Sequence, residues 1–266
     1  MTDKILSSIT PVYGFCPFDS AGSLIECRAK ARVPENAQSI IVCLFPYFLG
    51  NNAYEGSDIS KYAAVPDYHE VILPLLSSAC ERLSELYPDE KFVCFADNSP
   101  IPEVRAAEAA GLGVRGKNGL FISRDFGSWV FIGEIVTTKK YCFDEIRSKG
   151  CLNCGKCIAA CPSGALTADG LCAEKCLSAV SQRKGTLSET EEELLKSSGC
   201  AWGCDICQNV CPMNADIKTE PLKQFLSDIK TKADTENIAG RAYAWRGRNV
   251  IERNIRILYS EKGQIV

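Results

Sequence analysis

The spacing of cysteines between positions 151 and 211 constrains this chain more than any other feature of its sequence. One segment, CLNCGKCIAACP, follows the pattern C-x2-C-x2-C-x3-C-P, and a later one, CDICQNVCP, repeats its second part as C-x2-C-x3-C-P. Thiolates at three-residue spacing converge on one iron centre, whereas the cysteine before the proline ligates the other cluster of a pair. The spacing therefore predicts two 4Fe–4S clusters whose ligands are crossed between the segments.

The predicted ligands form two sets of four, and one cysteine comes from between the segments. They are Cys151, Cys154, Cys157 and Cys211 for one cluster, and Cys161, Cys176, Cys204 and Cys207 for the other. Cys172 competes with Cys176 for the isolated position, and we prefer Cys176. The alternative, a pair of zinc ribbons, is disfavoured because zinc sites rarely use a third cysteine followed by x3-Cys-Pro.

Composition bears on compartment and partners. The chain has 16 cysteines and no segment that resembles a signal peptide or a membrane span, so a reducing cytoplasm is expected. Its net charge of −3 and pI near 5.5 do not favour bulk binding of nucleic acid, although a local basic patch stays open. The cysteines outside the clusters are expected to be mostly buried thiols: Cys16, Cys27, Cys43, Cys80, Cys94, Cys142, Cys172 and Cys200.

The first 140 residues alternate apolar runs with helical patterns. After an irregular lead-in over residues 1–37, buried strands are expected at 39–47, 91–97 and 128–138. Strands separated by helices predict an α/β or α+β sandwich for this part of the chain.

Two helices are expected between these strands. Apolar residues at helical spacing predict one over residues 67–86, with a kink or a break at Pro74. The other begins near Pro102 and is ended by Gly111 and Gly113, because proline suits a first helical turn and glycine a helix end.

The later part of the chain shows two further helical patterns. An acidic helix over 187–196 begins with Ser188 and has Glu191 three residues later, which is the spacing of a capping box. The tail over 221–259 is also expected to be helical. Its arginines form either the charged face of an amphipathic helix or a phosphate-contacting strip for a polynucleotide or a cofactor: Arg241, Arg246, Arg248, Arg253 and Arg256.

Clusters carry electrons but perform no substrate chemistry, so the first 140 residues are expected to hold the acceptor or the active site. Asp97 follows the second expected strand and is either a site acid or the cap of the helix near Pro102. The turn GLGVRGKNGL matches no nucleotide-binding pattern, but its bare backbone suits close approach to a large flat or phosphate-bearing cofactor. His69, the only histidine, is expected to be a packed residue at a helix start rather than a ligand or base.

Taken together, these stretches resemble the epoxyqueuosine reductase (QueG-like) family, which is related to reductive dehalogenases. The matching segments are ISKYAAVPDYH (59–69), FADNSPIPEVRAAEAAGLGVRGKNGLFI (95–122), GSWVFIGEIVTT (127–138), the double-cluster segment and RGRNVIERN (246–254). The cluster motif occurs in many ferredoxin-like modules. The pairing of Asp-x-x-Pro with AGLG-x-x-GKN upstream of it is much more specific.

The resemblance implies an α+β chain with three parts. An α/β sandwich that binds cobalamin and carries the active site is expected over residues 1–140, a ferredoxin-like double-cluster domain over 141–219, and a helical tail over 220–266. The tail would be the remnant of the family's C-terminal helical-repeat domain, which makes this a short member.

The resemblance also implies a reaction. Electrons would pass through both clusters to cobalamin, and low-valent cobalt would reduce the epoxide of epoxyqueuosine in tRNA, or a related small epoxide or halide. Asp97 falls on the family's proton donor, and Cys176 on its isolated cluster ligand. The family's cofactor contacts fall on Asp97, Gly113, Gly116, Lys117, Asn118 and Ser128.

Partners follow from the same resemblance. An external donor such as flavodoxin or ferredoxin would supply electrons, and no membrane is expected to take part. The alternative is an electron-transfer or corrinoid-reactivating iron–sulfur protein without tRNA activity, which the short tail and the acidic balance motivate.

Overall fold

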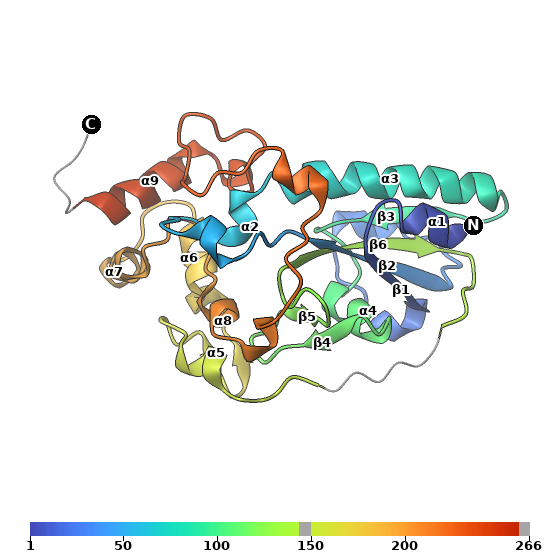
Figure 1. Cartoon of the computed structure of the whole chain (residues 1–266), viewed down its shortest axis with the longest axis horizontal. Coiled ribbons are helices and arrows are strands. Elements are labelled where there is room, and N and C mark those ends of the chain that lie inside the picture. Colours follow the sequence, from blue (N-terminus) through green and yellow to red (C-terminus); the bar gives the residue numbers. More distant parts are fainter. Residues whose placement is uncertain (144–149, 261–266) are drawn as a thin grey trace.

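A four-stranded sheet forms the centre of the molecule (Figure 1), in a computed structural model that describes residues 1–143 and 150–260. The strand order is β1-β2-β6-β3, and every neighbouring pair is antiparallel. The strands are β1 (Val12–Pro17), β2 (Ser39–Pro46), β6 (Val130–Thr137) and β3 (Phe92–Phe95). The three strands expected from apolar runs are therefore confirmed, each slightly shorter than predicted.

β1 was missed, because an irregular lead-in was expected over residues 1–37. Five of its six residues are only partly buried, and it contains Gly14 and Pro17, so its sequence lacks the apolar run of a central strand. It lies at one edge of the sheet, where proline is tolerated.

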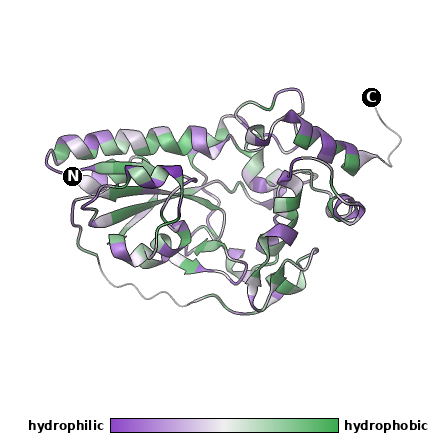
Figure 2. Ribbon diagram, turned by 180° about the vertical axis from the view of Figure 1, so that it is seen from behind, coloured by the Kyte–Doolittle hydropathy of each residue, from purple (hydrophilic) through white to green (hydrophobic). Residues whose placement is uncertain are grey.

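Both faces of the sheet are covered (Figure 1), which is why every residue of β2 is buried. Ile41, Cys43 and Phe45 belong to the apolar cluster beneath α3 (Tyr68–Leu86). The alternate residues of β2 belong to a second cluster under α4 (Glu103–Ala109). In Figure 2 the strands are accordingly hydrophobic, whereas α9 (Arg248–Tyr259) is mostly hydrophilic.

α3 begins as the sequence predicted but does not break. Its N-cap is Asp67, whose carboxylate accepts a hydrogen bond from the backbone nitrogen of His69 at 3.0 Å. The helix continues through Pro74 to its end at Leu86, so of the two expected effects of this proline, a kink or a break, the break is wrong. The short α1 (Thr2–Leu6) lies beside it, and α2 (Lys61–Ala64) precedes it.

The glycine-rich turn after α4 is a β-hairpin rather than a loop. α4 ends at Ala109, and Gly111, just after its C-cap Ala110, has a φ of +72°, so the predicted glycine stop at Gly111 is confirmed. Gly113, however, starts strand β4 (Gly113–Arg115), which pairs with β5 (Phe121–Ser123). A Cβ at Gly113 would lie 2.1 Å from the carbonyl oxygen of Ile122, so the hairpin requires glycine there.

The cysteine-rich half is built of short elements beside the sheet domain (Figure 1). They are α5 (Lys156–Ala159), β7 (Leu166–Thr167), β8 (Gly170–Leu171), α6 (Leu177–Gln182), α7 (Glu189–Ser198) and α8 (Ile206–Asn209). The predicted capping box is confirmed: Ser188 Oγ accepts from the nitrogen of Glu191 at 3.4 Å, and Glu191 accepts from the nitrogen of Ser188 at 2.9 Å.

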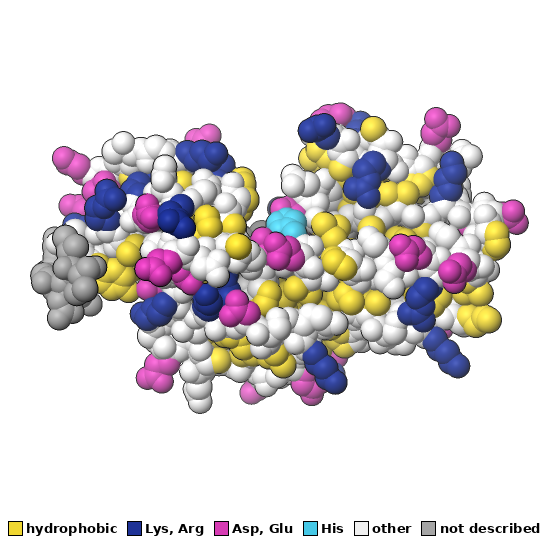
Figure 3. All heavy atoms as spheres, turned by 90° about the horizontal axis from the view of Figure 1, so that it is seen from above, with side chains coloured by type: hydrophobic (Ala, Val, Ile, Leu, Met, Phe, Trp, Pro, Cys, Tyr) yellow, Lys and Arg dark blue, Asp and Glu magenta, His cyan; other side chains and the backbone are white. Residues whose placement is uncertain are grey.

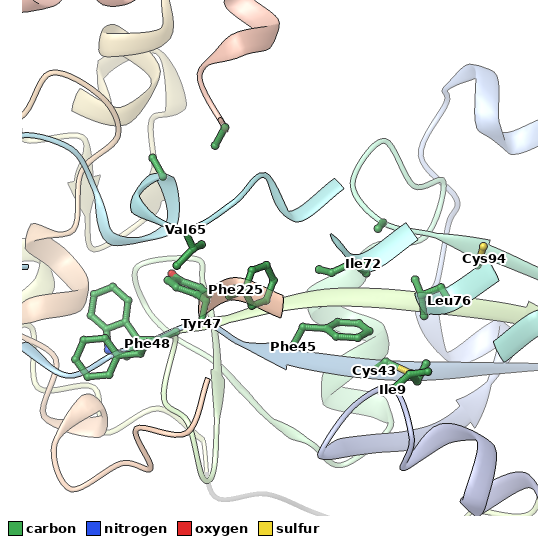
Figure 4. Packing of buried hydrophobic residues seen from close by; sticks show 14 of the residues in the cluster. Ile9, Cys43, Phe45, Tyr47, Phe48, Val65, Ile72, Leu76, Cys94 and Phe225 are labelled. Atoms are coloured by element: carbon green, nitrogen blue, oxygen red, sulfur yellow. The ribbon is translucent and has the colours of Figure 1, made fainter. Parts of the chain in front are cut away.

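The tail differs from the helix that was expected over 221–259. Residues 219–247 run mainly as irregular chain with short 3-10 turns, and only α9 is an α-helix. Tyr243 and Ile251 are fully buried in the same cluster as β2 and α3. Phe225 joins them: its ring lies 5.3 Å from that of Phe131, and Figure 4 shows it beside Tyr47. The tail therefore completes the main core.

Two of the tail's arginines serve structure. Arg241 is 1% exposed and pairs with the carboxylate of Asp228, which argues against a charged surface role for it. Arg253 donates to the carbonyl oxygens of Arg183 and Gly185, at 2.7 and 2.5 Å, and so ties α9 to the cysteine-rich half. Across the two described ranges, no helix is both long and apolar enough to cross a membrane.

Candidate functional site

Two adjoining cavities lie where the sheet domain meets the cysteine-rich half. The first, which we call the Asp97 cavity, has a volume of about 520 Å³ and is lined by Tyr68, His69 and Asp97. The second, the cluster cavity, has about 340 Å³. Both are lined by the same five residues, which form their common wall: Tyr62, Leu120, Ser128, Val130 and Phe131.

The cysteines predicted as ligands separate into the two expected groups. One complete set lines the cluster cavity: Cys161, Cys176, Cys204 and Cys207. The other set lines a separate pocket: Cys151, Cys154, Cys157 and Cys211. Cys172 is exposed and is not among the described residues that line either space. The geometry therefore favours Cys176 over Cys172, as the sequence did.

This arrangement fits iron–sulfur cubes better than single metal ions. Within residues 1–143 and 150–260, no three His, Cys, Asp or Glu side chains converge closely enough to hold one ion. Four of the thiols instead line the cluster cavity of about 340 Å³, which leaves room for a cube. Burial raises the pKa of Cys204 to about 11 and that of Cys207 to about 12, and the nearby cysteines add to both shifts. A bound cationic cluster reverses this penalty by stabilising the thiolates.

Asp97 is presented to its cavity by an unusual turn. β3 ends at Phe95, and both Asp97 and Asn98 then adopt positive φ values, of 50° and 37°. Positive φ is uncommon outside glycine, although Asp and Asn tolerate it best. The sheet is antiparallel, so the rule that ligands gather at the carboxyl ends of parallel strands does not explain this position. The turn itself aims the carboxylate.

Two residues at the start of α3 lie beside the Asp97 carboxylate. His69 Nε2 lies 3.1 Å from Asp97 Oδ2, and its other ring nitrogen, Nδ1, lies 2.8 Å from Asp67 Oδ1. Tyr68 also lines the Asp97 cavity, close enough to Asp97 to lower the pKa of its carboxyl. Figure 3 shows the single histidine, in cyan, in a hollow of the surface beside acidic side chains.

These contacts determine the charge of the pair. Hydrogen bonds from His69, the backbone of Asn98 and Tyr68 lower the pKa of Asp97. Hydrogen bonds to Asp67 and then to Asp97 raise the pKa of His69 to about 9. At neutral pH the site thus holds an imidazolium against a carboxylate. His69 does lie at a helix start, as expected, but its ring is part of the site. The sequence feature that could have indicated this role is its position two residues after the cap Asp67.

Two further acids lie behind Asp97, and sequence reasoning missed both. Glu134 is fully buried, and neither of its carboxyl oxygens has a hydrogen-bond partner within the described chain. Burial and then the charge of Glu103 raise its pKa well above the usual value. Burial and the charge of Asp97 raise the pKa of Glu103 to about 7. The available signal was a glutamate inside the apolar strand segment FIGEIVTT.

The residues of the glycine-rich hairpin face the cysteines. Gly116, Lys117 and Asn118 line the pocket of Cys151, and Asn118 also lines the cluster cavity. Gly113 is buried in the hairpin and is not among the described residues lining either cavity. The role of these four hairpin residues as cobalamin contacts stays a prediction. Gly116, Lys117 and Asn118 lie beside the predicted cluster ligands, and Gly113 does not.

Ser128 is the predicted contact that borders both cavities. Its hydroxyl donates to Gln208 Oε1 at 2.8 Å and accepts from Asn214 Nδ2 at 2.8 Å. Its backbone nitrogen donates to Asn214 Oδ1, also at 2.8 Å. The wall between the cavities is therefore hydrogen-bonded directly to the cysteine-rich half.

Comparison with known proteins agrees with this arrangement. Residues 150–214 match a family described as the 4Fe-4S double cluster binding domain, and residues 28–98 match one described as Epoxyqueuosine reductase QueG, DUF1730. An epoxyqueuosine reductase from Cyclobacterium marinum is 33% identical over 76% of this chain and 67% of its own. The chain belongs to the epoxyqueuosine reductase family.

Other members of the epoxyqueuosine reductase family agree in sequence and fold. The protein of Lactococcus garvieae is 35% identical over 76% of this chain, which spans 61% of the length of that relative. The structure of the Streptococcus thermophilus epoxyqueuosine reductase superposes with a TM-score of 0.82 at 26% identity, over 97% of this chain and 80% of the other. The fold expected from the resemblance is thereby confirmed, while the proposed domain boundaries at 140 and 219 stay predictions.

Proposed function

We propose that this chain is an oxidoreductase that reduces the epoxide of epoxyqueuosine in tRNA, with electrons passing through two 4Fe–4S clusters to cobalamin in the Asp97 cavity. The observation that carries the proposal is the common wall of the two cavities: a proton-holding pair faces one side of it and four cysteines face the other. Electrons and protons can thus reach the same space from opposite directions.

Cobalamin fits the Asp97 cavity by the character of its lining. Tyr68, Val130 and Phe131 supply an apolar and aromatic surface, and Ser128 supplies a hydroxyl at the border with the clusters. These residues would hold the corrin ring in the Asp97 cavity. When bound there, the group supplies a strongly reducing cobalt centre.

The chain's own residues supply the protons. Removing the oxygen of an epoxide as water and leaving a carbon–carbon double bond consumes two electrons and two protons. Asp97 in its usual acid role would have to be protonated, but its low pKa keeps it ionised. We therefore assign the mobile proton to the pair: it rests on His69 Nε2 and passes through Asp97 Oδ2 to the substrate oxygen. Solvent resupplies the imidazole, which is one-third exposed.

The substrate follows from the family, because all the relatives described above carry the name epoxyqueuosine reductase. One structure of the same fold was solved with an epoxyqueuosine-modified tRNA stem loop, so the stem loop is the substrate to test first. A related small epoxide or halide is the next choice. We further propose a flavodoxin or ferredoxin as electron donor, in the reducing cytoplasm suited to a chain whose 16 cysteines lie outside disulfides.

The test is reconstitution under anaerobic conditions. Purified protein is loaded with iron, sulfide and cobalamin, desalted, and analysed for bound metal and corrinoid absorbance. The proposal expects about eight iron atoms, four per cluster, and retained corrinoid. Protein that holds both clusters and no corrinoid would overturn it in favour of the electron-transfer alternative. Retained corrinoid that reactivates a partner corrinoid protein, with no turnover of the stem loop, would favour the corrinoid-reactivating alternative.

A further inference from the structure

Trp245 stands apart from the other two tryptophans of the chain. Trp129 and Trp202 are almost fully buried, whereas Trp245 is 60% exposed. It lines the rim of the Asp97 cavity together with Gln182 and Ala242. A large aromatic side chain left in solvent at the mouth of a cavity has no role in the core, so the ring face that Arg246 leaves uncovered is available to a ligand.

The position of Trp245 is held firmly by its neighbours. It lies in a 3-10 turn, Ala244–Arg246, that follows the fully buried Tyr243. The hydroxyl of Tyr243 accepts a hydrogen bond from the backbone nitrogen of Asp234 at 3.0 Å. Gly247 closes the turn at a φ of +87°, and its nitrogen donates to the carbonyl oxygen of Ala244 at 2.9 Å. The indole is thus presented by a rigid support.

A cation is stacked on the indole. The guanidinium carbon of Arg246 lies 3.7 Å from the centre of the Trp245 ring, and Arg246 Nε is buried with no hydrogen-bond partner among the described residues. Arg248, two residues further on, is exposed. The Arg248 guanidinium also donates to the carbonyl oxygen of Glu236 at 2.6 Å. An aromatic plane with an arginine stacked on it has the composition of sites that stack a nucleobase and contact the adjacent phosphate.

We propose that Trp245 and Arg246 form a stacking site for a single-stranded RNA nucleotide next to the base that enters the Asp97 cavity. The inference rests on the proposed function, since it names how the tRNA substrate is held. The chain as a whole carries a net charge of −3, so contact with RNA must be local, and this arginine-flanked indole lies at the cavity mouth where a flipped-out base would enter.

The test measures binding separately from turnover. A fluorescently labelled anticodon stem loop is titrated into reconstituted wild type, Trp245→Ala, Trp245→Phe and Phe143→Ala, a control that removes another exposed aromatic ring. The titrations are repeated with stem loops made abasic on either side of the modified position. Stacking predicts a Kd about ten-fold or more weaker for Trp245→Ala, partial retention in Trp245→Phe, and no change in Phe143→Ala.

The abasic probes decide whether the effect is stacking. With one of the two abasic stem loops, Trp245→Ala should weaken the Kd little further, because the missing base is the one that stacks on the indole. Equal loss on every stem loop, an unchanged Kd, or loss of corrinoid instead of RNA would overturn the inference. If the losses from Trp245→Ala and from the abasic position are not additive, but wild type does not reduce the substrate, the stacking site is supported and the proposed function is contradicted. If wild type reduces the substrate but the two losses are additive, the proposed function is supported and the stacking site is contradicted.

Discussion

The cysteine-rich half and the Asp97 cavity are adjacent, yet they are specified in different ways. Most cluster ligands are set by spacing along short segments, where residues three apart share one turn of chain. The Asp97 cavity instead combines the start of α3, the turn after β3, the start of α4 and the start of β6. A site built from local spacing keeps its chemistry visible in the sequence, while one built from distant segments has its charge states determined only by the fold.

The largest effect on iron content and turnover is expected from the loss of a predicted cluster ligand. Cys176→Ser is expected to remove the cluster of the cluster cavity, halving bound iron to about four atoms per chain and abolishing turnover. Cys172→Ser is the matched control and should keep its iron, because that thiol faces solvent. Iron analysis of both variants checks this, and the opposite pattern would assign the ligand to Cys172.

The next effect tests the acid. Asp97→Asn preserves the shape of the side chain but cannot pass a proton from His69 to the substrate. We expect kcat to fall by about 10²–10⁴-fold, with iron and corrinoid content unchanged. Single-turnover rates under reducing conditions provide the measurement. Activity within a factor of two of wild type would show that another group delivers the proton.

A smaller and pH-dependent effect tests the partner of Asp97. Wild-type activity should decline as pH rises through about 9, because His69 then loses the proton that it shares. His69→Gln removes that proton store and allows the pKa of Asp97 to rise toward its usual value. Its residual activity should therefore be greatest at acid pH and decline well below neutrality. A pH profile of His69→Gln that matches wild type would contradict the assignment.

The smallest effect concerns stability. Because the pKa of Glu134 is raised in the folded state, the wild type loses stability as pH rises above the ordinary glutamate range. Glu134→Gln does not titrate, so its advantage should grow with pH and reach at least about 2–4 °C in Tm at pH 8. Thermal unfolding of both proteins at pH 5 and pH 8 measures the difference. A lower Tm for the variant at pH 8 would show that the carboxylate is stabilised as an anion.

Elements with a clear local sequence pattern were predicted, and elements that depend on contacts with distant segments were missed. The central strand β2 was predicted because burial on both faces requires an unbroken apolar run. The edge strand β1 was missed because partial exposure leaves no such run. The tail before α9 was wrongly taken as helix, because its apolar residues, such as Phe225 and Tyr243, are buried in the main core from irregular chain.

Within the site, Asp97 was recognised but its charge was not. Its neighbours His69 and Glu134 lie far from it in the sequence and approach it only because α3 and β6 flank β3 in the fold. Pairing between an ionised carboxylate and an imidazolium depends on those distances. No sequence motif contains these distances. The resemblance therefore indicated Asp97 alone as proton donor, whereas the structure pairs it with His69.

The most direct test of the account is turnover of an epoxyqueuosine-containing anticodon stem loop by the reconstituted protein with a reduced flavodoxin or ferredoxin, followed by mass spectrometry of the RNA. The account predicts a product that has lost one oxygen atom, formed by wild type at least about 10²-fold faster than by Asp97→Asn. An unaltered stem loop, from wild type that carries both clusters and the corrinoid, would contradict it.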